Sequence, residues 1–184
     1  MIFHETRLTG AYLIELAPHA DERGFFARSF CADEFTSHGL NPCVRQSNVS
    51  LNHKKGTVRG MHFQTAPYEE AKLVRCTRGE ILDVMIDLRP ESPTYMQWVA
   101  EHLSEDNHRA LYVPEGFAHG FQSLTDHAEL TYQVSQMYAP LYASGVRFDD
   151  PAFSIEWPLP VSVISEADSS WPLYTPLTMT KERI

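Results

Sequence analysis

A histidine close to two cationic side chains is the most informative feature of this chain. Val58–Gln64 reads VRGMHFQ, so His62 follows Arg59 by three residues, and Lys72 comes ten residues later in the run KLVR. An imidazole can exchange a proton near neutral pH, because its ordinary pKa is about 6.5. Arginine and lysine can hold an anionic ligand and a developing oxyanion beside it. The segment therefore predicts an acid/base site that binds a phosphorylated ligand.

Three more residues could take part in such chemistry. His119 lies in the segment PEGFAHGF, Tyr132 in the alternating run LTYQV, and Asp168 in SEADSSWP. A tyrosine on the inner face of a barrel can donate a proton across a ligand from a base, and a carboxylate can orient an imidazole. The structural alternatives stay open at this point. His62 could be a core histidine, Tyr132 a packed aromatic with its hydroxyl at the rim, and Asp168 an exposed loop carboxylate.

The position of Arg59 relative to His62 depends on how regular their strand is. Side chains alternate between the two faces of a strand, so His62 shares a face with Gly60 and Gln64. In a regular strand Arg59 faces away from His62. Only a β-bulge would turn the two side chains toward the same side.

Short apolar or alternating runs recur along the chain and are separated by glycine- and proline-containing turns. We expect strands at Tyr12–Leu16, Gly24–Phe30, Val44–Leu51, Val58–Gln64, Lys72–Thr77, Ile81–Leu88, Tyr95–Leu103, Ala110–Val113, Gly116–Leu124 and Glu129–Gln136. Many short strands at this spacing indicate an all-β sandwich or barrel. The helical periods that a Rossmann-type fold requires between its strands are absent.

The remaining segments complete the expected fold. Only Ala32–His38 has the pattern of a short helix, with Asp33 as its cap. Several of the 12 prolines follow residue 139, which predicts an irregular C-terminal segment wrapped on the barrel. Ile2–Glu15 could be an edge strand that pairs with a second subunit, because an unprotected sheet edge invites such pairing.

The length and composition indicate one globular domain over residues 1–184. Apolar residues make up 43% of the chain, which is too many for a disordered protein. The net charge of -9 argues against general nucleic-acid binding. A local basic pocket could still hold a small polyphosphate on such an acidic protein.

The chain also shows no sign of export or of a membrane span. Its N-terminus lacks a basic start followed by an apolar run, and no stretch of 18 apolar residues occurs. The cysteines at positions 31, 43 and 76 lack C-x-x-C spacing, so we expect neither a disulfide framework nor a zinc site. Free thiols in a cytoplasmic protein are the simplest interpretation.

Several ordered motifs give the chain a family resemblance from about residue 13 to residue 172. They are DERGFF at 21–26, RGMHFQ at 59–64, KLVRC at 72–76, SPTY at 92–95, PEGFAHGF at 114–121 and IEWP at 155–158. In these motifs the chain resembles the dTDP-4-dehydrorhamnose 3,5-epimerases, the RmlC-like branch of the cupins. The resemblance implies a jelly-roll homodimer that needs no metal or cofactor. It also implies a nucleotide-linked 4-keto-6-deoxyhexose as substrate, inverted at carbons next to the ketone.

The same resemblance assigns roles by position. It implies that His62 is the general base, that Asp168 orients it, and that Tyr132 is the acid on the opposite face. It further implies that Lys72 and His119 stabilise the enolate oxygen. The expected contacts with the nucleotide and the diphosphate are Arg23, Gln46, Asn48 and Arg59, and Tyr138 resembles an aromatic residue that lines the same cleft. Arg28 is a further candidate for a substrate contact, at a position where the chain departs from the family.

The chain departs from the family pattern at a few positions. Arg28 stands where a glutamate is usual, Gln133 replaces a lysine after the tyrosine, Phe148-Asp149 replaces Trp-Asn, and Ala143 replaces a glutamate. A guanidinium only donates hydrogen bonds, which suits the acceptors of cytosine. Arg28 therefore raises the hypothesis of a CDP-linked substrate. In the alternative, Arg28 points to solvent or to the diphosphate.

Two other classes of function compete with an epimerase. A non-catalytic sugar-nucleotide-binding cupin would have no use for an opposed acid and base. A metal-dependent cupin oxygenase would typically carry His-x-His, and here Gln64 stands two residues after His62. An epimerase acting at C3, at C5 or at both carbons is the function that these residues favour.

Overall fold

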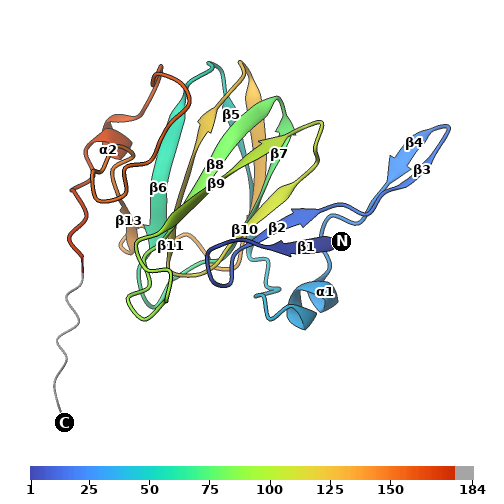
Figure 1. Ribbon diagram of the computed structural model, residues 1–184, viewed down its shortest axis with the longest axis horizontal. Coiled ribbons are helices and arrows are strands. Elements are labelled where there is room, and N and C mark those ends of the chain that lie inside the picture. The colour runs from blue at the N-terminus through green and yellow to red at the C-terminus, as the bar shows by residue number, and fades with distance from the viewer. Residues whose placement is uncertain (177–184) are drawn as a thin grey trace, which may run out of the picture.

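Two antiparallel β-sheets face each other and form a barrel in this computed structural model, which describes residues 1–176 (Figure 1). The six-stranded sheet contains, in spatial order, β1 (Ile2–Glu5), β2 (Tyr12–Glu15), β10 (Ala110–Val113), β7 (Lys72–Arg78), β12 (Ala128–Val134) and β5 (Gln46–Asn52). The five-stranded sheet contains β13 (Ala143–Gly145), β6 (Val58–Gln64), β11 (Phe117–Ser123), β8 (Glu80–Asp87) and β9 (Trp98–Ser104). The predicted all-β, cupin-type jelly roll is confirmed.

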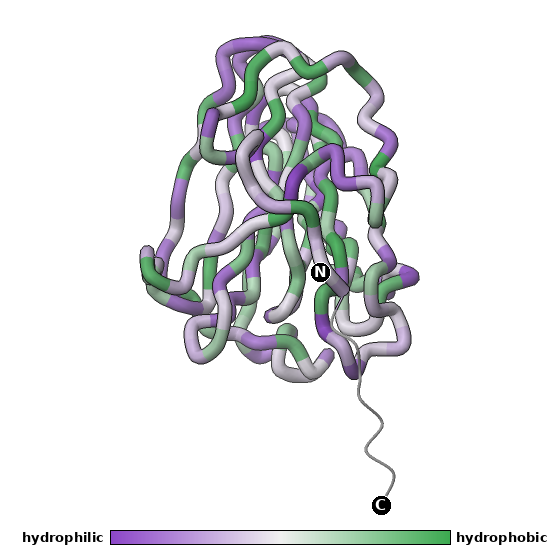
Figure 2. The backbone as a smooth tube through the Cα atoms, turned by 90° about the vertical axis from the view of Figure 1, so that its left-hand side faces the viewer, coloured by the Kyte–Doolittle hydropathy of each residue, from purple (hydrophilic) through white to green (hydrophobic). Residues whose placement is uncertain are grey.

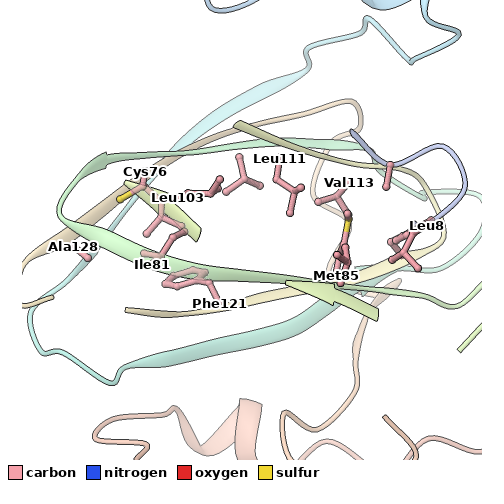
Figure 3. Packing of buried hydrophobic residues seen from close by; sticks show 14 residues of the cluster. Leu8, Cys76, Ile81, Met85, Leu103, Leu111, Val113, Phe121 and Ala128 are labelled. Carbon is pink, nitrogen blue, oxygen red and sulfur yellow. The ribbon is translucent and has the colours of Figure 1, made fainter. Parts of the chain in front are cut away.

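Apolar side chains from both sheets meet inside the barrel and form its main core. Leu111 and Val113 of β10 face Ile81 and Met85 of β8 and Phe121 of β11 (Figure 3). Burial of each such side chain stabilises the fold by about 1.5–3 kcal/mol. Hydrophilic and hydrophobic residues follow each other at short intervals along the chain in Figure 2, as expected for strands with one face turned to the core.

The irregular C-terminal segment covers the outer face of the five-stranded sheet. Val84 and Ile86 of β8 point outward and pack in a second cluster with Phe153, and Ile155 and Trp157 pack against it. Because β8 is covered on both faces, six of its eight residues are buried. The prediction of an irregular segment wrapped on the barrel is confirmed.

A hairpin of β3 (His19–Asp21) and β4 (Gly24–Phe26) projects away from the barrel (Figure 1). Phe26 is 76% exposed and Phe25 is 49% exposed. The predicted strand Gly24–Phe30 is therefore too long, because beyond Phe26 the chain has no partner strand to pair with.

The helices among residues 1–176 are short, and none is long and apolar enough to cross a membrane. α1 (Ala32–Ser37) forms where a helix was predicted, but Asp33 is not its cap. Cys31 occupies the N-cap position without a side-chain bond, and Asp33 lies in the first turn, where its charge favours the helix dipole. α2 (Glu166–Ser169) was not predicted; the Ser165 side chain caps it by accepting the backbone N–H of Asp168 at 3.0 Å.

A bulge in β6 changes the direction of the side chains that matter most. His62 pairs with His119 of β11, whereas Arg59 pairs with Phe121, so β6 takes three steps where β11 takes two. Gly60 lies in this irregular stretch with a φ of 114°, and a Cβ atom there would lie 2.5 Å from the Cα atom of Gly120. Only glycine fits this position.

Candidate active site

A cavity of about 750 Å³ opens between the two sheets, and its wall contains every predicted site residue except Arg23 and Arg28. Strands β5, β7 and β12 of the six-stranded sheet form one side. Strands β6, β11 and β13 of the five-stranded sheet, together with α2, form the other. The cavity has a size typical of small-molecule sites.

The register of the six-stranded sheet sets the first wall. Asn48 of β5 lies directly opposite Tyr132 of β12, while Gln46 and Lys72 both lie opposite Val134. Because residues paired in register point to the same face, these side chains share the inner face of the sheet. The alternation that predicted Tyr132 on an inner face is therefore seen in the structure.

The bulge in β6 sets the second wall by turning Arg59 and His62 into the same cavity. The Nε atom of Arg59 donates to the Oδ1 atom of Asn52 at 2.8 Å, which fixes the direction of the guanidinium. A regular strand would have turned Arg59 away from His62. The bulge turns both side chains into the cavity instead, as the sequence analysis allowed for a bulged strand.

Two histidines on this wall are each bonded to a carboxylate. His62 Nε2 lies 2.6 Å from Asp168 Oδ1, and His119 Nε2 lies 2.8 Å from Asp83 Oδ1. Since His62 and His119 are partners in register, the two pairs lie side by side. A carboxylate only accepts hydrogen bonds, so the His62 Nε2 atom carries the hydrogen and Nδ1 has the lone pair that can take a proton.

Asp83 was missed by the sequence reasoning although a signal was present. It stands in the apolar strand β8 between Leu82 and Val84, and its side chain is fully buried. A carboxylate is rarely buried unless it is paired. Alternation also places Asp83 on the inner face with Ile81 and Met85, on the strand next to β11.

Asp168 is held by backbone groups as well as by His62. Its Oδ2 atom accepts the N–H of Gly60 at 3.2 Å, and its own N–H donates to the Ser165 hydroxyl. Burial alone would raise the pKa of Asp168. The hydrogen bond and charge of His62, followed by bonds from Gly60 and Ser165, outweigh this and hold the pKa below its ordinary value. Asp168 is therefore ionised at neutral pH and can orient the imidazole.

Lys72 and Tyr132 provide an ammonium and a phenol on the opposite side. The Nζ atom of Lys72 donates to the backbone oxygen of His62 at 3.2 Å. Burial is the main cause that raises the pKa of the Tyr132 hydroxyl, the negative charge of Glu70 adds to it, and Arg59 partly offsets both. Tyr132 is therefore protonated at neutral pH, as a proton donor must be.

Tyr138 lies at the mouth of the cavity and is 64% exposed. Its backbone N–H donates to the Oε1 atom of Gln46 at 2.8 Å. Gln46 thus supports the loop of Tyr138 in addition to lining the wall itself.

Arg23 and Arg28 lie outside this cavity in their own chain. The Arg23 side chain is 85% exposed on the β3–β4 hairpin and pairs with Asp21 at 2.6 Å. The Nη1 atom of Arg28 lies 3.1 Å from the Oε1 atom of Glu34. One chain alone does not bring either guanidinium to the other predicted site residues.

Gln64 stands at the position where a metal-binding cupin has the second histidine of its His-x-His motif. Its side chain is hydrogen-bonded to other groups of the protein. The Gln64 amide accepts the N–H of Ala139 at 2.6 Å and donates to the oxygens of Tyr68 and Met137. Within residues 1–176, no three His, Cys, Asp or Glu side chains lie close enough to share a metal ion. Gln64 therefore stabilises the loops around the cavity by hydrogen bonds to their backbone groups.

The fold and the cavity define a cupin-type jelly roll with an imidazole–carboxylate pair facing a phenol. A family model described as dTDP-4-dehydrorhamnose 3,5-epimerase matches residues 5–175. The enzyme of that name from Methanothermobacter thermautotrophicus is 43% identical over 172 residues, covering 92% of both proteins. The chain belongs to the dTDP-4-dehydrorhamnose 3,5-epimerase family.

Solved structures of related proteins agree with this assignment. A Bacillus anthracis dTDP-4-dehydrorhamnose 3,5-epimerase with bound TDP and PPi has a TM-score of 0.90 and 40% identity, covering 94% of this chain and 99% of that one. A 3'-monoepimerase from Streptomyces bikiniensis with bound dTDP-quinovose has a TM-score of 0.83 and 35% identity, covering 92% and 86%.

The ionised state of Asp168 leads to a prediction about stability. Asp168→Asn should lower the free energy of unfolding at pH 7 by about 1.5–3 kcal/mol, the usual contribution of a hydrogen bond to a charged group. A carboxyl whose pKa is lowered by folding stabilises the native state above its unfolded pKa, and this contribution is lost as the pH falls through the folded pKa. Urea unfolding at several pH values should therefore show the difference shrinking below about pH 4.

Asp149→Asn is the matched control, because it removes an exposed carboxylate paired with Arg147. Exposed pairs contribute only about 0–1 kcal/mol, so this change should matter much less. An Asp168→Asn effect that is as large at pH 3 as at pH 7 would contradict the ionised Asp168.

Proposed function

We propose that this protein epimerises a dTDP-linked 4-keto-6-deoxyhexose at the carbons next to the ketone. The observation that carries the proposal is the arrangement of one cavity, with the His62–Asp168 pair on one sheet and Tyr132 on the other. Inversion of a carbon requires proton removal on one face and proton delivery on the other. A protein that only bound the sugar nucleotide would have no use for this arrangement.

The chemistry needs protein side chains only. His62 Nδ1 takes the proton from a carbon next to the ketone, and the electron pair of the C–H bond moves to form an enolate. Lys72 and His119 stabilise the negative charge on the enolate oxygen, as preorganised donors do for other oxyanions. Tyr132 then delivers a proton to the opposite face of the same carbon, and the ketone re-forms. Solvent water takes the proton from His62 and returns one to Tyr132, so that both groups are ready for the next inversion.

The nucleotide end of the substrate carries negative charge, which Arg59 can bind in the cavity. Gln46 and Asn48 can bond the nucleotide, and Tyr138 at the mouth can contact the sugar or the base. Bound TDP in the B. anthracis relative supports thymine as the base. The CDP hypothesis raised by Arg28 stays a prediction. We propose inversion at both C3 and C5, because the matching family model is described as a 3,5-epimerase. The S. bikiniensis relative differs in this respect, since it is a 3'-monoepimerase.

The three thiols are free in the structure, which fits the reducing cytoplasm that we propose as the location of the protein.

The first prediction tests the reaction and its base together. With a dTDP-linked 4-keto-6-deoxyglucose in deuterated water, the wild-type protein should place deuterium at C3 and C5, seen by NMR or mass spectrometry. His62→Ala should slow the exchange by about 10²–10⁴-fold or more, because loss of a general base costs that much. Binding of dTDP by calorimetry should change little. The absence of exchange in the wild-type protein would rule out the proposed function.

The second prediction separates the two protons. Tyr132→Phe removes the acid but leaves His62, Lys72 and His119 in place. The variant should still exchange the substrate hydrogen with solvent, whereas net formation of the inverted sugar should fall sharply. Undiminished inversion by Tyr132→Phe would exclude Tyr132 as the acid.

We also propose that the protein is a homodimer in which the β3–β4 hairpin reaches the cavity of the partner. An isolated two-stranded hairpin is marginally stable in water, and this one exposes Phe25 and Phe26. The outer face of the six-stranded sheet exposes Val49 and Leu51. A second chain that covers these residues would also bring Arg23, and Arg28 just beyond the hairpin, to a nucleotide site.

The third prediction tests this shared site by complementation. Arg23→Ala and His62→Ala should each be strongly impaired as separate dimers. When the two proteins are unfolded together and refolded, mixed dimers contain one cavity with an intact His62 and an intact Arg23 from the other chain. Part of the wild-type exchange should return. If Arg23 serves the cavity of its own chain, mixing will restore nothing.

A further inference from the structure

Glu70 is a half-buried carboxylate in the cavity wall, and neither the family resemblance nor the reaction scheme above gives it a role. It precedes β7 by two residues, and its side chain is 13% exposed. Its Oε1 atom lies 3.2 Å from the Nζ atom of Lys72. Its Oε2 atom accepts the Nε2–H of Gln64 at 3.2 Å. One carboxylate thus contacts two side chains that shape the site.

The contact with Lys72 restricts the direction of its ammonium group. An ammonium has three hydrogens to donate. One goes to the backbone oxygen of His62, and the Glu70 carboxylate attracts the ammonium as an ion pair at 3.2 Å. These two contacts restrain the position of the ammonium group, and a remaining hydrogen can meet an oxygen of a ligand in the cavity.

The contact with Gln64 supports one orientation of its amide, the orientation that the backbone oxygens of Tyr68 and Met137 also favour. A carboxylate only accepts, so the Nε2 end of Gln64 must face Glu70. The Oε1 end then faces the N–H of Ala139, which donates to it at 2.6 Å. Ala139 follows Tyr138 directly, so Glu70 helps to fix the loop that carries this aromatic residue.

We propose that Glu70 is a positioning residue for epimerisation, which orients the Lys72 ammonium toward the substrate oxygen and keeps the Gln64 amide turned toward the Tyr138 loop. This inference rests on the proposed function. Glu70 does not touch the reacting carbon in this account, since it acts through Lys72 and Gln64.

The charge of Glu70 also influences the acid on the same wall. Burial raises the pKa of Tyr132 most, and the negative charge of Glu70 raises it further. Activity that depends on a protonated Tyr132 is lost as the pH rises through that pKa. Removal of the Glu70 charge should therefore move this loss of activity to lower pH.

The kinetic test compares Glu70→Ala, Glu70→Gln and the neighbouring control Glu69→Gln. Glu70→Ala should lower kcat by up to about 100-fold, the cost of a small misplacement of a catalytic group. Glu70→Gln keeps an acceptor for Lys72, so its kcat should fall less than that of Glu70→Ala. In its pH–rate profile, however, the loss of activity at high pH should occur at a lower pH than in the wild type. Glu69 lies outside the cavity wall, and Glu69→Gln should keep the wild-type profile. A wild-type kcat in Glu70→Ala, or a pH–rate profile of Glu70→Gln whose loss of activity at high pH coincides with that of the wild type, would overturn the proposal.

A titration without substrate keeps the test independent of the reaction. The eight tyrosines can be labelled with ¹³C at Cζ, and the Tyr132 signal is the one missing from Tyr132→Phe. Its pKa should be lower in Glu70→Gln than in the wild type and unchanged in Glu69→Gln. Equal Tyr132 pKa values in all three proteins would refute the inference even if the wild type is active. If the wild type shows no exchange of substrate hydrogen but the Tyr132 pKa is lower in Glu70→Gln, the proposed function is refuted and the effect of Glu70 on the site is not.

Discussion

The close approach of Gly60 to Gly120 is the constraint on which the site depends. The two backbones lie so near that a Cβ atom on either residue would overlap the other strand. This approach accompanies the extra residue in β6, which turns Arg59 and His62 to the same side. Gly60 also donates its N–H to Asp168, so the same residue helps to hold the carboxylate that orients the imidazole. Bulges often re-aim side chains next to active sites in this way.

The two sheets divide the chemistry between them. The five-stranded sheet holds imidazoles paired with buried or half-buried carboxylates, and the six-stranded sheet holds a phenol and an ammonium. The core below fixes the distance between the sheets, because its side chains fill the space between them. The cavity is therefore a place where a sugar ring can lie between the base on one sheet and the acid on the other.

Much of this arrangement could be predicted from the sequence. Period-2 alternation located most strands, including the run that carries Tyr132, whose side chain lies in the cavity wall. Its pairing with Asn48 could not be predicted, because β5 and β12 are distant in sequence. The sequence could not show that β6 departs from regular alternation, because that depends on contact with β11. Four residues give too weak a helical pattern to predict α2, and the N-cap of α1 lies at Cys31, two residues before the predicted cap Asp33. Asp83 acquires its partner His119 only through β11, a strand that is distant in sequence.

The central claim is that base and acid act on opposite faces of one sugar ring. The most direct measurement is a crystal structure of the protein with a dTDP-linked 6-deoxyhexose that lacks the ketone and cannot react. We expect the ring to lie between His62 and Tyr132, with the imidazole and the phenol within about 3–3.5 Å of opposite faces. A ring that contacts both side chains on the same face, or that lies outside the cavity, would contradict it.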